Sequence, residues 1–344
     1  MGKSARGDDF DIRLLDGRKR EYGYDVRDGE AGLRLDQFLA RRLSWRSRTS
    51  VQQLVDEGHV RLEGRTARSS RRVAMGERII VRLPRPLRDT ERRAVRDPDA
   101  SLRRLFEDDV LIAIDKPPDM SVHPAGRLLH QTVITELHRE YRNFEDEEAD
   151  CVPRLCHRLD LETSGVLLVA KTREALVFVQ RQFARRQLRK EYQTLVHGEM
   201  EDDEGLVKLP LGPRLGGKVR HAMGVRHDDA GQPSTTQWKV IERFDGYTRL
   251  HIDLLTGRRH QIRVHMAAVG HPVVGDKIYG RDDEIFLRYL DCEMTEEDRT
   301  LLELPRQALH SSALTFKHPE KGQMRIASPW PADLKKFTDQ LKRS

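Results

Sequence analysis

The positive charge of this chain is concentrated in one short N-terminal window, and this concentration constrains the domain organisation. The window Ala31–Pro84 contains 12 arginines, no lysine and five acidic residues, so its net charge is +7. The whole chain of 344 residues carries +6, so the remainder sums to about −1. At roughly 150 residues per domain, this length allows about two domains. We therefore expect a small basic domain joined to a larger, nearly neutral one.

The composition and the N-terminus exclude several classes of protein. No stretch approaches the roughly 18 uninterrupted apolar residues that a membrane span requires, and the polar N-terminus lacks the apolar core of a secretory signal. Cys151, Cys156 and Cys292 are too few and too scattered for a disulfide framework or a cysteine-rich zinc site. We therefore expect a cytoplasmic monomer with no membrane partner.

The basic window has the apolar spacing of a small folded domain. Apolar residues recur at helical intervals over 33–43 and again over 51–58, and strand patterns follow over 59–64 and 76–84. Arginine forms bidentate contacts with phosphate and stacks on bases. A solvated charged surface is the alternative, but the density of arginine and the scarcity of acids favour nucleic-acid binding. The arginines expected to contact nucleic acid are Arg34, Arg41, Arg42, Arg46, Arg48, Arg61, Arg65, Arg71 and Arg72.

Two segments of the window, LRLDQFLARRL and VQQLVDEGHVRLEGR, resemble the S4 RNA-binding domain. The resemblance implies a small α/β module that binds RNA, and it names no reaction. The charged, proline-containing stretch Pro84–Pro98 then indicates a linker. The expected organisation is an N-terminal extension over 1–30, the S4-like module over 31–84, a linker over 85–101 and a larger domain over 102–344.

A polar turn that leads into an apolar strand is the most informative part of the larger domain. In the segment Pro153–Thr172, VLLVAK predicts a buried strand and Thr172 predicts the start of a helix. Asp160 therefore lies in a polar loop beside a buried strand, where burial and a nearby cation set the pKa of a carboxylate. Spacing alone leaves three roles open: a structural ion pair with arginine, half of a glycosidase pair with Glu162, or a lone nucleophile.

The same segment resembles a known enzyme family. HRLDLETSGVLLVAKT is similar to the HRLDxxTSG signature of the RluA-type pseudouridine synthases. Four further segments resemble other motifs of the family, in the family's order: IAIDKPPDMSVHP, RKEYQTLVHGE, LLTGRRHQIRVHMAAVGHPVVGDKIYG and LHSSALTFKHP. The resemblance implies an α+β catalytic domain over 102–344, with a mixed, mostly antiparallel central sheet and flanking helices.

The resemblance also implies the reaction and its residues. In an RNA uridine the C1′–N1 bond breaks, the uracil rotates and C5 joins C1′, so no atom is gained or lost and no cofactor is needed. Asp160 is implied to be the nucleophile, Arg263 the basic partner that keeps it ionised, and Tyr192 the aromatic residue that stacks on uracil. Attack on the base, attack on the sugar and elimination to a glycal all remain open as routes.

Access to the reacting bond requires that the nucleotide leave the stacked RNA, at a cost of a few kcal/mol. Arg158 matches a position that the family uses near the vacated stack. His157 and Thr163 are expected to position the substrate, His157 by orienting or packing the turn. Arg259 stands where the family usually has Thr, and it is expected either to add a phosphate contact or to alter the fit of the substrate.

Three histidines near the third motif, His260, His265 and His271, lack the HExxH spacing, so we expect packing roles and no metal site. The chain is therefore expected to be an RNA pseudouridine synthase acting on large-subunit ribosomal RNA, with transfer RNA as an alternative substrate. A non-catalytic RNA-binding or ribosome-assembly factor on the same scaffold is the competing class. The presence of all three implied catalytic residues argues against it.

Overall fold

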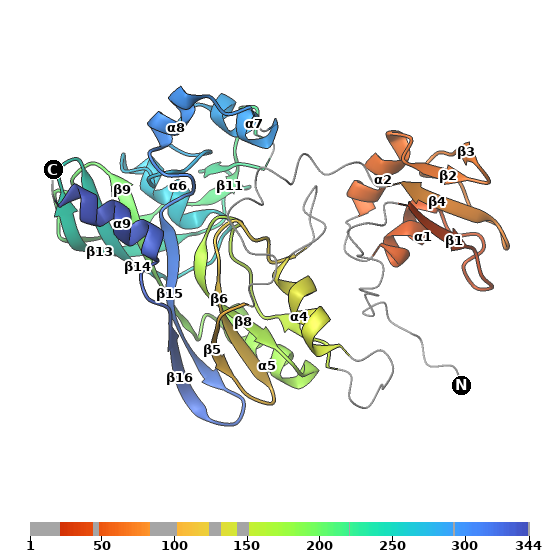
Figure 1. Ribbon diagram of the computed structural model, residues 1–344, viewed down its shortest axis with the longest axis horizontal. Coiled ribbons are helices and arrows are strands. Elements are labelled where there is room, and N and C mark those ends of the chain that lie inside the picture. Colours follow the sequence, from red (N-terminus) through yellow and green to blue (C-terminus); the bar gives the residue numbers. More distant parts are fainter. Residues whose placement is uncertain are drawn as a thin grey trace. The chain divides into compact units, whose positions relative to one another are not determined.

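The computed structural model describes seven stretches of the chain, which form two compact units (Figure 1). The stretches are residues 21–43, 48–82, 102–123, 132–142, 151–219, 221–291 and 293–342. The first unit holds the described residues up to 82 with 123 and 132–140, and the second holds 102–122 and those from 141 onward. The predicted linker over 85–101 lies outside the described residues. Within the stretches above, no helix is long and apolar enough to cross a membrane.

The first unit contains a four-stranded antiparallel sheet in the order β1-β4-β2-β3. Its elements are β1 (Glu21–Asp25), α1 (Leu35–Arg42), α2 (Arg48–Asp56), β2 (Val60–Leu62), β3 (Arg65–Thr66), β4 (Arg78–Arg82) and α4 (Val133–Tyr141), whose last residue belongs to the second unit. The two helices and two strands expected in the basic window are present as α1, α2, β2 and β4. The sheet also takes in β3 and β1, and β1 lies within the expected extension 1–30. Tyr22 and Val26 are buried in the core of this unit.

Apolar residues on one face of each helix form this core. Leu35, Phe38 and Leu39 of α1 are buried in the same cluster as Leu54 and Val55 of α2. Intervals of three and four residues place such side chains on one side of a helix. Arg41 of α1 and Gln53 of α2 are exposed, whereas Asp36 of α1 is buried together with the apolar residues.

The second unit is built on one ten-stranded sheet with the main order β10-β13-β14-β9-β15-β8-β6-β5. β16 pairs with β15, β7 pairs with β8, and every pairing is antiparallel except that of β8 with β15. The strands are β5 (Arg104–Glu107), β6 (Leu111–Lys116), β7 (Arg154–Leu155), β8 (Ser164–Ala170), β9 (Arg189–His197), β10 (Glu204–Lys208), β13 (Thr235–Phe244), β14 (Tyr247–Leu254), β15 (Leu309–His318) and β16 (Gly322–Ala327). This is the mixed, mostly antiparallel sheet that the resemblance implied.

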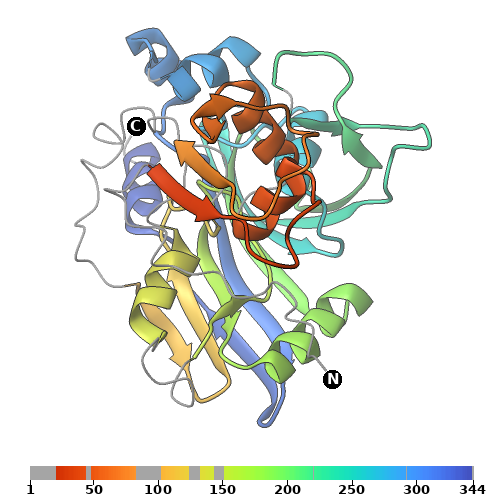
Figure 2. The ribbon, with the colours of Figure 1, turned by 90° about the vertical axis from the view of Figure 1, so that its right-hand side faces the viewer.

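Helices and a short hairpin complete the described part of the second unit (Figure 1, Figure 2). They are α5 (Arg173–Arg185), the hairpin strands β11 (Leu211–Pro213) and β12 (Met223–Val225), α6 (Gln261–Ala268), α7 (Asp283–Asp291), α8 (Glu296–Leu302) and α9 (Ala332–Leu341). α5 packs on β8 and β15, whereas α6 lies against β12 and β13. The flanking helices confirm the predicted α+β class.

The strand predicted from VLLVAK is β8, and all seven of its residues are buried. It lies between β6 and β15 in the sheet. Burial on both faces explains why its sequence is continuously apolar and does not alternate. The helix that follows begins as predicted at Thr172, whose side-chain oxygen accepts a hydrogen bond from the N–H of Ala175 at 3.2 Å. This well-packed strand directly follows the turn that carries Asp160.

Candidate active site

Asp160 lies in the polar turn between β7 and β8, and its side chain is 27% exposed. The turn is closed by the N–H of Thr163, which donates to the carbonyl oxygen of Asp160 at 3.2 Å. Gly165, the second residue of β8, has a φ of +107°, and a Cβ there would lie 2.2 Å from the carbonyl oxygen of Ser311. Only glycine allows β15 to approach this closely, so the end of the turn is fixed against β15.

A guanidinium on α6 connects Asp160 with a second carboxylate. Arg263 donates from Nη1 to Asp160 Oδ2 at 3.2 Å, and from Nε and Nη2 to Asp276 Oδ2 and Oδ1 at 2.6 and 2.8 Å. Asp276 Oδ1 also accepts from the backbone N–H groups of Ile278 and Tyr279. The Arg263 side chain is 7% exposed, and its guanidinium lies 5.0 Å from the centre of the Tyr279 ring. The arginine is therefore held in one orientation toward Asp160.

The charges around Asp160 keep its carboxylate ionised. Burial by itself raises the pKa of Asp160, but His260 in its protonated form, Arg263 and Arg158 outweigh burial, and the pKa lies below its usual value. Burial also lowers the pKa of Arg263, but its carboxylate partners raise the pKa by more than burial lowers it. This side chain therefore stays protonated. Burial lowers the pKa of His260 to about 4. This ring is therefore neutral at pH 7, and Arg263 is the permanent cation in contact with Asp160.

Tyr192 lies on β9, where it is paired with Ser311 of β15 and Ile252 of β14. Only 8% of the residue is exposed. Burial raises the pKa of Tyr192 to about 12, a hydrogen bond with Ser311 opposes this change, and the charge of Asp160 adds to it. The phenol is thus neutral at pH 7 and close enough to Asp160 to sense its charge. The three residues that the resemblance implied to be catalytic lie together in the structure, although they come from a turn, a strand and a helix.

A buried lysine that the sequence did not single out supports the turn from β6. Lys116 Nζ donates to the carbonyl oxygens of Pro117, Met120 and Leu161 at 2.7, 2.9 and 2.9 Å. Burial lowers the pKa of Lys116 to about 7. Because Leu161 directly follows Asp160, the lysine anchors the backbone of the turn next to the carboxylate.

The other side of the turn is held by two residues far along the chain. Lys277 Nζ donates to Glu162 Oε1 at 2.6 Å, and the backbone N–H of Gln307 donates to Oε2 at 3.1 Å. The Gln307 amide also donates to the hydroxyl of Thr163 at 2.6 Å. Both oxygens of Glu162 are occupied in this way, so Glu162 supports the turn and does not form a glycosidase pair with Asp160. No local pattern signals contacts that span 115 and 145 positions.

The remaining residues predicted to position the substrate have different surroundings. The His157 ring stacks on Phe183 at 4.9 Å and accepts a hydrogen bond from the N–H of Leu168 at 3.0 Å. Burial lowers the pKa of His157 to about 4, so the ring is a neutral packing group at pH 7. Arg158 and Arg259 are both exposed, which leaves their guanidinium groups at the surface.

The three histidines considered as a metal set face different partners. His260 faces Asp160 at 3.9 Å, His265 bonds to the hydroxyl of Thr236 at 2.8 Å, and His271 bonds to a backbone carbonyl at 2.9 Å. Among the residues that the structure describes, no group of three or more His, Cys, Asp or Glu side chains is arranged to hold a metal ion.

The arginines expected to bind RNA fall into two groups in the first unit. Four form ion pairs with acids of the same unit: Arg34 and Arg48 with Asp36, Arg42 with Glu30, and Arg71 with Glu77. Four others are exposed and form no ion pair within the described stretches: Arg41, Arg61, Arg65 and Arg72. Arg46 lies outside the described residues. The available positive charge is therefore smaller than the sequence count suggests.

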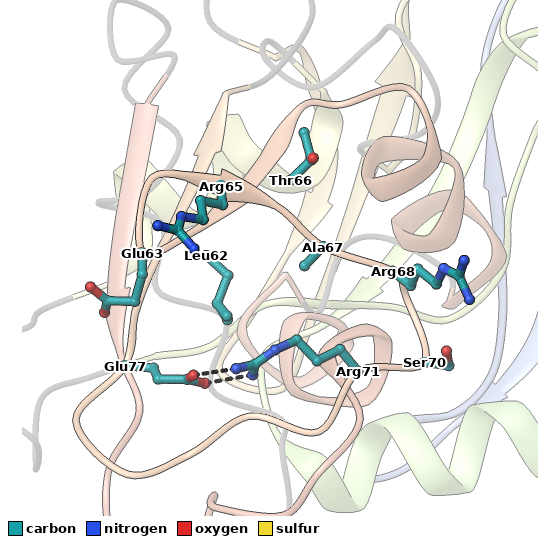
Figure 3. Close-up of a pocket in the computed structure, with 9 residues that line it drawn as sticks. All are labelled: Leu62, Glu63, Arg65, Thr66, Ala67, Arg68, Ser70, Arg71 and Glu77. Carbon is teal, nitrogen blue, oxygen red and sulfur yellow. Dashed lines mark hydrogen bonds and ion pairs between the residues drawn. The ribbon is translucent and has the colours of Figure 1, made fainter.

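A shallow pocket of this unit is formed by the β2–β3 hairpin and the loop after it (Figure 3). Arg71 donates to both carboxylate oxygens of Glu77, at 2.9 and 2.6 Å. In Figure 3 the Arg65 side chain extends to the left and the Arg68 side chain to the right of the view. Both side chains are exposed, and neither forms an ion pair in the described part of the chain.

Comparisons with known proteins agree with this geometry. A family model described as RNA pseudouridylate synthase matches residues 110–268, and the S4 domain model matches residues 33–79. A protein of Nitrosomonas europaea named ribosomal large subunit pseudouridine synthase D is 38% identical over 312 residues, which cover 90% of this chain and 84% of the relative. A protein of Vibrio cholerae with the same name is 34% identical, covering 92% of this chain and 94% of the relative.

The fold has solved counterparts as well. The structure of human RNA pseudouridylate synthase domain containing 4 matches with a TM-score of 0.54 at 22% identity, covering 70% of this chain and 93% of that one. The chain belongs to the RNA pseudouridylate synthase family and carries an S4 domain. It is an isomerase that acts on RNA, and the RluA-type resemblance seen in the sequence is confirmed.

Proposed function

We propose that this enzyme converts uridines of large-subunit ribosomal RNA to pseudouridine, with Asp160 as the nucleophile. The contact of Asp160 with Arg263 carries the proposal, because an ionised carboxylate held by a fixed, buried guanidinium is suited to nucleophilic attack. The printed names of the relatives support a ribosomal substrate. The exposed arginines of the S4 domain supply phosphate contacts that do not depend on sequence.

Each residue has one task in this proposal. The target uridine leaves the stack, and the exposed Arg158 and Arg259 contact the surrounding RNA. Tyr192 stacks on the uracil, and Asp160 attacks the base, attacks C1′ or promotes elimination. The C1′–N1 bond breaks, the C1′–C5 bond forms, C5 loses its hydrogen to solvent and N1 gains a proton. The atoms balance without an oxidant, a reductant or a cofactor.

Release of tritium from RNA labelled at C5 of uridine tests the proposal. We expect the full chain to release tritium from large-subunit ribosomal RNA transcripts, and Asp160→Asn to lower the rate by about a thousandfold or more. Asp339→Asn, at an exposed position of α9, is the matched control and should retain the wild-type rate.

The possible contrary results separate the parts of the proposal. An unchanged rate in Asp160→Asn would overturn the assignment of the nucleophile. Release from transfer RNA but not from ribosomal RNA would overturn the substrate. No release from any RNA would favour a non-catalytic RNA-binding factor. We further expect the enzyme to act as a monomer in the cytoplasm, which sedimentation and cell fractionation would test.

A further inference from the structure

A second group besides Arg263 faces the carboxylate of Asp160, and it ends a chain of polar contacts that begins at the β11–β12 hairpin. The backbone N–H of Met223 donates to the hydroxyl oxygen of Tyr279 at 2.8 Å. The same oxygen lies 2.7 Å from Nδ1 of His260. On the opposite side of the ring, His260 Nε2 lies 3.9 Å from Asp160 Oδ1. Arg263 contacts the other oxygen, Oδ2.

The tautomer of His260 follows from these contacts. The N–H of Met223 already occupies one acceptor site on the Tyr279 oxygen, so the single hydroxyl hydrogen is free to point at His260 Nδ1. The ring hydrogen then resides on Nε2 and is directed at the Asp160 carboxylate. The opposite tautomer would direct a lone pair at a negatively charged oxygen, which is repulsive. Both considerations assign the hydrogen to Nε2.

Burial keeps the His260 ring neutral, and the charged groups around it act in both directions. Burial is the largest cause that lowers the pKa of His260, and Arg263 and Arg259 lower it further, whereas Asp160 and Asp276 raise it. A neutral ring donates one hydrogen bond from Nε2 without passing a proton to the carboxylate. Asp160 therefore remains an anion while it is approached by a donor on each oxygen.

The ring is also fixed in place. His260 precedes α6 with a left-handed backbone, φ +54° and ψ +19°, and its side chain is 10% exposed. It meets the Tyr279 ring edge to face, with centroids 5.7 Å apart and planes at 73°. The next residue, Gln261, bonds to the hydroxyls of Thr256 and Thr236, so the backbone beside His260 is anchored.

We propose that His260 is a positioning residue, which directs its Nε2–H at Oδ1 of Asp160 and with Arg263 fixes the plane of the carboxylate. The separation of 3.9 Å exceeds a hydrogen bond. Such contacts are often long without substrate and shorten in the enzyme–substrate complex, so we expect this one to close when RNA occupies the site. The inference rests on the proposed function, because it concerns the same carboxylate.

Two substitutions of nearly equal length separate a donor from a packing group. In His260→Gln the side-chain amide places an N–H near the position of Nε2, whereas His260→Met fills the space without a donor. Single-turnover tritium release from ribosomal RNA should fall about 10- to 100-fold in His260→Met, the factor for losing one hydrogen bond to a charged group. His260→Gln should recover most of the rate, and the Kd for RNA should be unchanged in both variants.

The pH dependence of the same rate distinguishes the two roles, because a residue that only packs in the site would not change it. Loss of a donor destabilises the ionised form of Asp160, so the acidic limb of the profile should move to higher pH by more in His260→Met than in His260→Gln, which keeps a donor. Tyr279→Phe keeps the ring against Arg263 but removes the hydroxyl. It should slow the wild type and have no further effect in His260→Met, because the two residues act in one chain.

Three results would overturn the inference: a wild-type rate in His260→Met, equal losses in the Met and Gln variants, or additive effects of Tyr279→Phe and His260→Met. Failure of the proposed function would look different, because the wild type would then release no tritium from any RNA. In that case NMR of ¹⁵N-labelled histidine and ¹³C-labelled aspartate decides the question. A hydrogen on Nε2 of His260, and a higher Asp160 pKa in His260→Met, would support the inference, and Nδ1–H would overturn it.

Discussion

Asp276 holds the guanidinium of Arg263 through two parallel hydrogen bonds, from Nε at 2.6 Å and from Nη2 at 2.8 Å. Because these two donors are occupied, only Nη1 is directed at Asp160, and that contact is single, at 3.2 Å. A bidentate contact with Asp160 would cover both oxygens of the carboxylate. The single contact stabilises the anion through Oδ2 and leaves Oδ1 facing Nε2 of His260.

Asp276→Asn should therefore impair chemistry more than RNA binding. The amide retains one acceptor but no longer matches the guanidinium, so Arg263 loses its fixed direction. We expect the single-turnover rate to fall about 10- to 100-fold, with the Kd for RNA unchanged. The free energy of unfolding should fall by about 3 kcal/mol because a buried ion pair loses one partner. Urea unfolding and tritium release measure the two effects, and an unaltered rate would contradict this account of Arg263.

Lys277→Met should destabilise the second unit by leaving the buried carboxylate of Glu162 without its cation. The expected loss is about 3 kcal/mol in the free energy of unfolding. Adding Glu162→Gln should restore much of that loss, because the unpaired charge is then removed. A double-mutant cycle of urea unfolding measures the coupling. Purely additive losses would show that the pair does not contribute as a unit.

Gly165→Ala tests how tightly β8 and β15 must approach beside the turn that carries Asp160. The added Cβ would lie 2.2 Å from the carbonyl oxygen of Ser311, at a φ of +107°, so we expect a loss of about 3 kcal/mol or more. Gly246→Ala is the matched control, because its φ is +74° but nothing lies within 4 Å of the new Cβ. Its expected loss is about 1 kcal/mol. Similar thermal unfolding of the two variants would contradict the crowding argument.

Acid should weaken the S4 domain through Asp36. Burial raises the pKa of this carboxyl, but hydrogen bonds from Arg34, Gln52 and Arg48 outweigh burial and lower it from 3.8 to about 2. Because the pKa of Asp36 is lower in the folded than in the unfolded state, its ionised carboxyl stabilises the fold at pH values above the unfolded pKa. This contribution is lost as the pH falls from about 4 to about 2.

The predicted loss is about 2 kcal/mol across that interval. Hydrogen exchange of peptides from α1 and α2 in the full chain measures it. Asp36→Asn should remove this part of the pH dependence, whereas Asp56→Asn, at the exposed end of α2, should preserve it. The same pH dependence in both variants would exclude Asp36 as its origin.

Replacing Arg65 and Arg68 by alanine should weaken RNA binding without weakening the fold. Neither side chain forms an ion pair in the described part of the chain, so both are free to contact phosphate. The slope of log K against log salt should become less steep by about 1 for each arginine. Arg42→Ala is the contrasting control: Arg42 pairs with Glu30 at 2.7 Å, and its loss should alter the slope less. If Arg42→Ala changed this slope more than the replacement of Arg65 and Arg68, the phosphate contacts would have to be assigned to Arg42 instead.

Strong local patterns in the sequence were sufficient to predict much of the fold. The continuous apolar run of β8 and the cap at Thr172 depend on neighbouring residues, and both are present. Asp160 and Arg263 were found through the resemblance, and they are in contact although 103 positions separate them. The strand β1 was not predicted, because EYGYD is short and lacks a continuous apolar face.

Pairing between distant charges could not be predicted in the same way. Asp276, Lys277 and Lys116 have no periodicity or spacing that connects them with the turn that carries Asp160. Their partners are defined only when strands and loops from three parts of the chain meet. The number of arginines in the sequence likewise does not show which of them are paired. Arg65 is exposed and forms no ion pair in the described part of the chain, whereas Arg71 is bonded to Glu77.

Asp276 and Lys277 are adjacent residues, yet one orients Arg263 and the other anchors the turn that carries Asp160. A single peptide unit therefore sets the spacing between the two anchors, and consecutive Cα atoms are about 3.8 Å apart. Engineering that inserts or deletes a residue near this dipeptide would shift both anchors together. Redesign toward other RNA substrates should instead vary surface positions such as Arg158 and Arg259, which have no part in that shared scaffold.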